Sequence, residues 1–131
     1  IAARRQLAAP SARRIAATVE SVSAMAWPAF AQALEHGLAR DGHAVQRLDG
    51  AGADFALERG GRRTLLAARR WKAARTGIEP LRELHAAIQA ADAHDGLYVA
   101  PGAVTDAARQ FAANHAIRLI DGAALAQLLR R

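Results

Sequence analysis

Asp54 is the residue of this chain whose position best suits metal and phosphate chemistry. It stands before an apolar run, and a second apolar run that ends near Ala67 follows the pair Gly60-Gly61. Two such runs joined by two glycines are typical of a β-hairpin with a tight turn. If the glycines form the loop, Asp54 faces Ala67 across the two strands.

A carboxylate in this place can hold a divalent cation beside a phosphodiester if the partner strand adds an oxygen ligand and a lysine. Side chains two residues apart share a face of a strand, so Ala67 and Arg69 are expected on the face of Asp54. Alanine offers no ligand atom. Arginine stays protonated, so Arg69 can donate to a phosphate but cannot take a proton from water. Lys72 has the opposite strand parity and is not expected to replace the missing base.

Basic side chains are concentrated around Trp71. They are Arg62, Arg63, Arg69, Arg70, Lys72 and Arg75. Together they predict a groove for a polyanion such as double-stranded DNA. The alternative is that they are solvated strand ends, with Glu58 offsetting Arg63. We expect Trp71 itself to pack in the core under the next helix rather than to stack on a base.

Several other kinds of site find no support in the sequence. The chain has no cysteine, which excludes disulfides, thiolate metal sites and cysteine nucleophiles. Its five histidines show no ligand spacing, and it contains no glycine-rich nucleotide-binding motif. The net charge of +6 is compatible with an anionic partner, either nucleic acid or a membrane surface.

Residues 1–26 are expected to form a linker and an N-terminal amphipathic helix. The linker covers residues 1–10, with Arg4 and Arg5, and the helix begins after the N-cap Ser11. Its apolar residues, which include Val19 and Val22, recur at helical spacing, so we expect it to pack on the rest of the domain. The alternative is a stalk leaving a membrane, which the flanking arginines favour. No stretch of the sequence reaches the roughly 18 apolar residues of a membrane span.

Residues 27–131 are expected to form one α/β domain. The elements predicted in it are a helix with Pro28 in its first turn that ends before Gly42, a strand over His43–Leu48, the hairpin, a helix from about Glu79, a strand over Leu97–Ala100, a helix from Thr105 or Asp106 to Asn114, a strand over Ile117–Ile120 and a closing helix capped by Asp121. Alternating strands and helices favour parallel pairing with right-handed crossovers. With the antiparallel hairpin, this predicts a mixed sheet of about five strands flanked by helices.

Four blocks in a fixed order carry a resemblance to a known family. They are GADFAL, RRTLLAARRWKA, GIEPLRELHAAI and GLYVAPGAVTDAARQFAANHAIRLIDGAALAQLL. Over roughly residues 27–129 the chain resembles the Mrr-like type IV restriction endonucleases. The resemblance implies a restriction-endonuclease-like fold, double-stranded DNA as partner and Mg²⁺ as cofactor of any cleavage.

The family pattern also implies site residues. An aspartate, a glutamine, a lysine and a tryptophan in the hairpin of the family fall at Asp54, Ala67, Arg69 and Trp71 of this chain. A glutamate that follows a phenylalanine in the first helix of the family falls at Ala31. The resemblance therefore implies a catalytic site reduced to Asp54 and Arg69, with Asp54 as the remaining metal ligand.

Three functions stay open at this point. The preferred one is a DNA-binding domain with impaired cleavage chemistry. The second is an active metal-dependent endonuclease in which Asp54 and Arg69 suffice, with Glu58 or Glu79 as a carboxylate that it could recruit. The third is a structural or regulatory domain of a membrane-anchored protein, with its anchor upstream of Ile1. The expected location is the cytoplasm or the cytosolic side of such an anchor, and the sequence predicts no particular oligomeric state.

Overall fold

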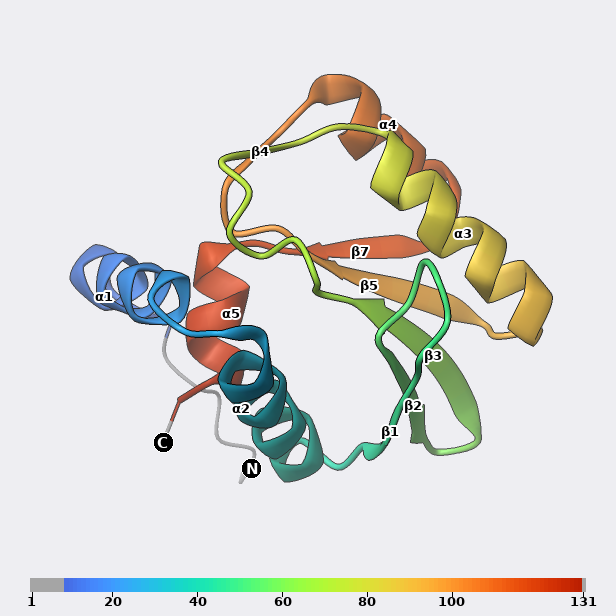
Figure 1. Cartoon of the computed structure of the whole chain (residues 1–131), viewed down its shortest axis with the longest axis horizontal. Coiled ribbons are helices and arrows are strands. Elements are labelled where there is room, and N and C mark those ends of the chain that lie inside the picture. The colour runs from blue at the N-terminus through green and yellow to red at the C-terminus, as the bar shows by residue number, and fades with distance from the viewer. Residues whose placement is uncertain (1–8, 131) are drawn as a thin grey trace, which may run out of the picture.

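A computed structural model of the protein describes residues 9–130 and shows one mixed sheet with helices on both faces (Figure 1). The sheet has five strands in the order β1-β2-β3-β5-β7, which are β1 (Ala44–Arg47), β2 (Phe55–Arg59), β3 (Arg62–Ala67), β5 (Asp95–Val99) and β7 (Ile117–Ile120). Strands β1, β2 and β3 pair antiparallel, whereas β3, β5 and β7 pair parallel. The predicted mixed α/β sheet is confirmed.

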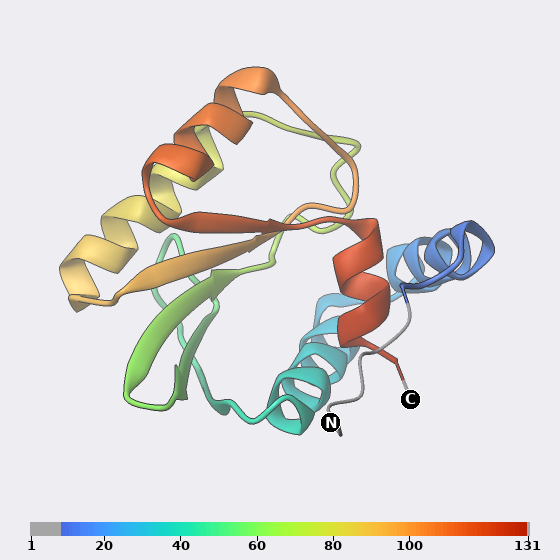
Figure 2. The same ribbon diagram turned by 180° about the vertical axis from the view of Figure 1, so that it is seen from behind.

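Within residues 9–130, five helices complete the fold. They are α1 (Ala12–Ser23), α2 (Trp27–Arg40), α3 (Glu79–Ala91), α4 (Asp106–Asn114) and α5 (Gly122–Leu128). Helices α2 and α5 cover one face of the sheet, and α3 and α4 cover the other (Figures 1 and 2). Each face buries its own apolar cluster, because strand side chains alternate between the two sides. In β3, for example, Leu65 faces α3 and α4, whereas Leu66 faces α2.

The hairpin has the predicted register. Arg59 pairs with Arg62 and Glu58 pairs with Arg63, so the two glycines form the loop. Gly60 and Gly61 have φ of 61° and 78°, the left-handed values that a two-residue hairpin turn requires at both central positions. The predicted pairing of residues therefore holds along the whole β2–β3 ladder, which ends at the pair Phe55 and Leu66.

The second hairpin strand ends earlier than predicted. Strand β3 stops at Ala67, and Trp71 N–H donates to the carbonyl of Ala68 in a turn. Arg69 is therefore a turn residue, and the parity argument that placed Arg69 and Lys72 on opposite strand faces is wrong. The chain then forms β4 (Arg75–Thr76), which pairs parallel with β6 (Ala103–Val104) in a small second sheet that the sequence did not predict.

The N-terminal helix packs on the body of the domain, as expected. It begins after Ser11, whose hydroxyl accepts from Arg14 N–H at 3.1 Å. Side-chain atoms of Ile15 and Val19 lie 3.1 and 3.2 Å from the point that a Cβ would occupy at Gly122, so α1 and α5 meet closely. Within residues 9–130, no helix has the length and apolarity that crossing a membrane demands. The predicted linker, with Arg4 and Arg5, lies outside the described residues apart from its last two positions.

The contact between α2 and the end of α5 depends on a glycine. A Cβ at Gly37 would lie 2.5 Å from the carbonyl oxygen of Leu128. Replacing glycine by alanine inside a helix ordinarily stabilises it by up to about 1 kcal/mol. We expect Gly37→Ala to lower the free energy of unfolding by about 1–3 kcal/mol instead, because α5 must shift. Urea denaturation measures the change.

Gly77→Ala is the matched control, because a Cβ there meets nothing within 4 Å. The control protein should unfold within about 0.5 kcal/mol of the parent. Equal stability of the two variants would show that the close approach at Gly37 is absent.

Candidate anion site at the mouth of the hairpin

Asp54 closes the turn that follows β3. Its Oδ2 accepts from the backbone N–H groups of Ala68 and Arg69, at 2.7 and 3.1 Å. Its Oδ1 accepts from Nε of Arg69 at 3.3 Å. In addition, Asp54 N–H donates to the carbonyl of Leu66 at 2.8 Å. The carboxylate therefore serves first as a hydrogen-bond acceptor of the turn.

Arg69 is held between a carboxylate and an aromatic ring. Its guanidinium carbon lies 4.1 Å from the ring centroid of Trp27, at the start of α2. The guanidinium thus combines an ion pair with a cation–π contact, which fixes its plane. The side chain of Arg69 is 60% exposed and that of Asp54 only 11%, so the cation still faces solvent.

The aromatic residues under this arginine belong to the core or, in the case of the half-buried Trp27, pack against it. Trp71 is buried in the core, as predicted, but it packs under α2 rather than under the next helix, α3, and stacks on Phe30 with ring centroids 4.7 Å apart. Its indole N–H donates to the carbonyl of Val22 at 2.8 Å. Trp27 lies 5.6 Å from Trp71, centroid to centroid. The platform beneath Arg69 is therefore rigid, because each ring is fixed by another.

A cavity of about 310 Å³ opens beside Asp54. Its lining includes Asp54, Ala67 and Arg69, so the structure brings these three predicted residues together. The cavity lies where β3 and β5 end, and the carboxyl ends of parallel strands are the usual place for a ligand in such sheets. Arg70 also lines it.

Two lining residues, Glu83 and Tyr98, were not found from the sequence. Tyr98 is directly opposite Ala67 in the parallel ladder, so the pairing of β3 with β5 could have revealed it. Burial raises the pKa of Tyr98, Arg70 lowers it, and Glu83 and Asp54 raise it further. The phenol is therefore a neutral hydrogen-bond donor at physiological pH. No signal in the sequence places Glu83 here, because its position depends on how α3 docks.

The carboxylates that the sequence offered as replacements do not join the cavity. Glu58 is exposed near the tip of the hairpin, and Glu79 pairs with Arg82 at 3.2 Å on the surface of α3. Ala31 is also outside the site, because it is fully buried in the cluster between α2 and the sheet. A glutamate at this position would place a charge in the apolar core.

The six basic residues around Trp71 do not all line the cavity beside Asp54. Arg62 and Arg63 lie at the hairpin tip, where Arg62 pairs with Asp95 at 3.1 Å. The five steps along β3 separate them from the cavity by about 17 Å. Arg69 and Arg70 line the cavity, and the ammonium of Lys72 lies 5.3 Å from the ring centroid of Trp71. Two of the six therefore line the cavity, two lie at the hairpin tip, and Lys72 and Arg75, the latter on β4, lie outside the cavity lining.

The donor set does not fit Mg²⁺ by itself. Among the described residues, no group of three or more histidine, aspartate or glutamate side chains is arranged to hold a metal ion. Both carboxylate oxygens of Asp54 already accept hydrogen bonds, and one of them faces the Arg69 cation. The arrangement suits an anion better, because Arg69, Arg70 and the Tyr98 phenol supply donors.

A family described as restriction endonuclease, Mrr_cat, matches residues 22–129. The solved DNA modification-dependent restriction endonuclease AspBHI is similar, with a TM-score of 0.66 and 18% identity over 98% of this chain and 40% of that one. MspJI restriction endonuclease, solved in complex with a 27-mer oligonucleotide, has a TM-score of 0.53 and 15% sequence identity. The match covers 98% of this chain and 34% of that one. A protein of unknown function, AF1548, has a TM-score of 0.56 and 15% sequence identity. The match covers 67% of this chain and 55% of that one.

These likenesses establish the fold. The chain spans between about a third and just over half of the length of these solved proteins. No curated protein matches the sequence significantly.

Removing the Asp54 carboxylate tests its role in the turn. We expect Asp54→Ala to lower the free energy of unfolding by about 1–3 kcal/mol, because two backbone N–H groups lose their acceptor. Asp54→Asn keeps a carbonyl acceptor and should lose less. Asp49→Ala, an exposed change in the preceding loop, is the control for urea denaturation. A loss from Asp54→Ala no larger than from Asp49→Ala would contradict the turn role.

Proposed function

The chain belongs to the Mrr_cat family of restriction endonucleases, and we propose that it is a DNA-binding domain of this family whose cleavage chemistry is impaired. The observation that carries the proposal is the contact between Arg69 and Asp54, 3.3 Å between Nε and Oδ1. It puts a permanent cation on the only carboxylate that the family pattern retains here. A guanidinium stays protonated, so it can bind a phosphate but cannot activate water.

The remaining geometry supports phosphate binding at the same place. Asp54 accepts from the Nε–H of Arg69, and the guanidinium carbon lies 4.1 Å from the centroid of the Trp27 ring. Neither contact uses the terminal amino groups of Arg69, and a phosphodiester can accept from two such groups. Arg70 and the Tyr98 phenol line the same cavity. The oligonucleotide bound to MspJI, a protein with this fold, makes DNA the preferred polyanion.

A second function has one observation in its favour. Glu83 lines the cavity together with Asp54, so two carboxylate residues border the same space. That pair supports an active endonuclease with Mg²⁺ as cofactor, provided that Arg69 moves away. The third function, a structural or regulatory domain of a membrane-anchored protein, predicts no affinity for DNA. We place the DNA-binding domain in the cytoplasm, where its proposed partner would be met.

Cleavage separates the first two functions. We expect no nicking of supercoiled plasmid above background with Mg²⁺ or Mn²⁺, because Ala67 offers no ligand and Arg69 no base. The double variant Ala67→Gln with Arg69→Lys should recover measurable nicking. We leave Ala31 unchanged in this variant, because a glutamate there would disrupt the core.

Adding Asp54→Ala to the double variant is the matched control, and it should abolish the recovered activity. If the unmodified protein cleaves with metal and Asp54→Ala removes that cleavage, the active endonuclease replaces our proposal.

Salt dependence tests the binding surface. Affinity for duplex DNA should fall with a log–log slope of about −0.9 per phosphate neutralised. Replacing Arg69 and Arg70 by alanine should reduce the magnitude of that slope by about 2 and weaken binding. Replacing Arg62 and Arg63 removes the same charge from the far end of the same strand and should have a smaller effect. Fluorescence anisotropy over a salt series measures both quantities.

Equal losses from the two double variants would indicate nonspecific attraction to a basic protein, contrary to the proposed surface. No binding near about 0.1 M salt would favour the structural domain instead.

A further inference from the structure

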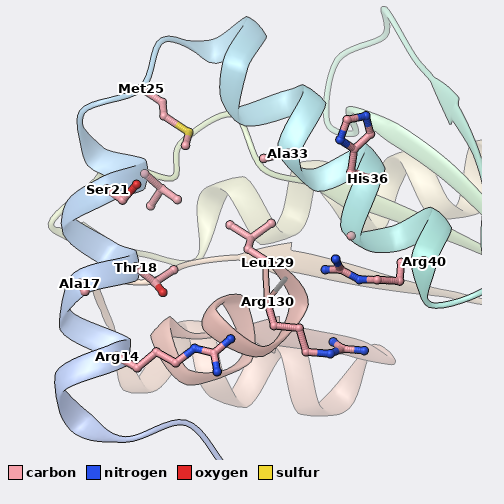
Figure 3. Close-up of a pocket in the computed structure, with 12 residues that line it drawn as sticks. Arg14, Ala17, Thr18, Ser21, Met25, Ala33, His36, Arg40, Leu129 and Arg130 are labelled. Carbon is pink, nitrogen blue, oxygen red and sulfur yellow. The ribbon is translucent and has the colours of Figure 1, made fainter.

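A second cavity, of about 470 Å³, lies between α1, α2 and the end of the chain after α5 (Figure 3). It shares no lining residue with the cavity beside Asp54. Its volume is within the range of about 300–1,000 Å³ that is usual for small-molecule sites.

The charge that lines this cavity is positive. Arg14, Arg40 and Arg130 line it together with His36, and no aspartate or glutamate is among the lining residues. Figure 3 shows Arg14 extending from α1 and Arg40 from α2 toward the chain end at Leu129 and Arg130. Cations brought together from three segments lower the energy of an anion placed among them.

Internal contacts hold two of these arginines, Arg40 and Arg130, without removing all of the positive charge. Arg40 Nη2 donates to the carbonyl of Leu128 at 2.9 Å, which fixes its position against a neutral acceptor. Arg130 pairs with Asp41 at 3.1 Å, so its charge is balanced. Arg14, near the start of α1, is exposed at the rim. Arg14 and Arg40 are therefore the residues whose charge a ligand would meet.

The rest of the lining has a polar side and an apolar floor. Thr18 and Ser21 follow Arg14 at positions i+4 and i+7, so their hydroxyls share one face of α1 with the guanidinium. Val22, Met25 and Leu129 supply apolar surface. A ligand that fits must carry an anionic group and an apolar body.

We propose that this cavity binds the phosphate ester of a nucleotide, either free or within a DNA strand. Arginine donates two parallel hydrogen bonds to phosphate oxygens, and the α1 hydroxyls add further donors. The base would lie on the apolar floor, where the polarizable Met25 thioether contacts aromatic rings favourably. This site is separate from the DNA surface at Asp54, so each can fail without the other.

Calorimetry with AMP tests the site. We expect AMP to bind, adenosine to bind more weakly because it lacks the phosphate, and inorganic phosphate to bind more weakly because it lacks the base. Arg14→Ala should weaken AMP binding about tenfold or more, the loss expected for a charge-assisted hydrogen bond. Arg13→Ala is the matched control, because Arg13 is the exposed neighbour on the same helix and does not line the cavity.

The same variants identify the source of the phosphate. If duplex DNA displaces AMP and Arg14→Ala also weakens duplex binding, the ester belongs to a DNA strand; if DNA leaves AMP bound, it belongs to a free nucleotide. Binding of AMP should be unchanged in the Arg69→Ala, Arg70→Ala double variant. Equal losses from Arg13→Ala and Arg14→Ala, loss of AMP binding in that double variant, or no AMP binding by the unmodified protein would each overturn the proposal.

Discussion

The hydrogen bonds from Ala68 and Arg69 N–H to the carboxylate of Asp54 organise the mouth of the hairpin. They join the residue before β2 to the turn after β3, so the strand cannot continue past Ala67. An unpaired backbone N–H in a partly buried turn is costly, which gives the carboxylate a structural task that is independent of any ligand. The orientation of Arg69 follows directly, because its own backbone is one of the two donors.

The helices reach this mouth through aromatic packing. Trp71 follows the turn, stacks on Phe30 of α2 and donates to the last turn of α1 through Val22. Trp27, at the start of α2, then lies under the guanidinium of Arg69. The charged site therefore stands on the core rather than on a free loop, and changes in the packing of α2 would move the cation.

The sequence was sufficient to predict those parts of the fold that depend on neighbouring residues along the chain. Two glycines and alternating apolar residues determined the hairpin register, and the spacing of strands and helices indicated a mixed sheet. The end of β3 could not be read in this way, because a distant carboxylate captures the amides that would extend it. Glu83 was missed because α3 docks on the loop at Gly52, where a Cβ would lie 2.5 Å from the carbonyl of Glu83. Ala31 was expected at the site, but helix packing turns it into the core.

A cation supplied by a side chain differs from a metal ion in its dependence on the surroundings. A metal site fills and empties with the free concentration of the ion, and the stability it confers follows that concentration. The guanidinium of Arg69 is tethered to the chain beside Asp54, so it faces the carboxylate at a local concentration that dilution of the protein or removal of free ions cannot change. The positive charge at the mouth of this hairpin is therefore present whenever the protein is folded, whatever the concentration of metal ions in solution.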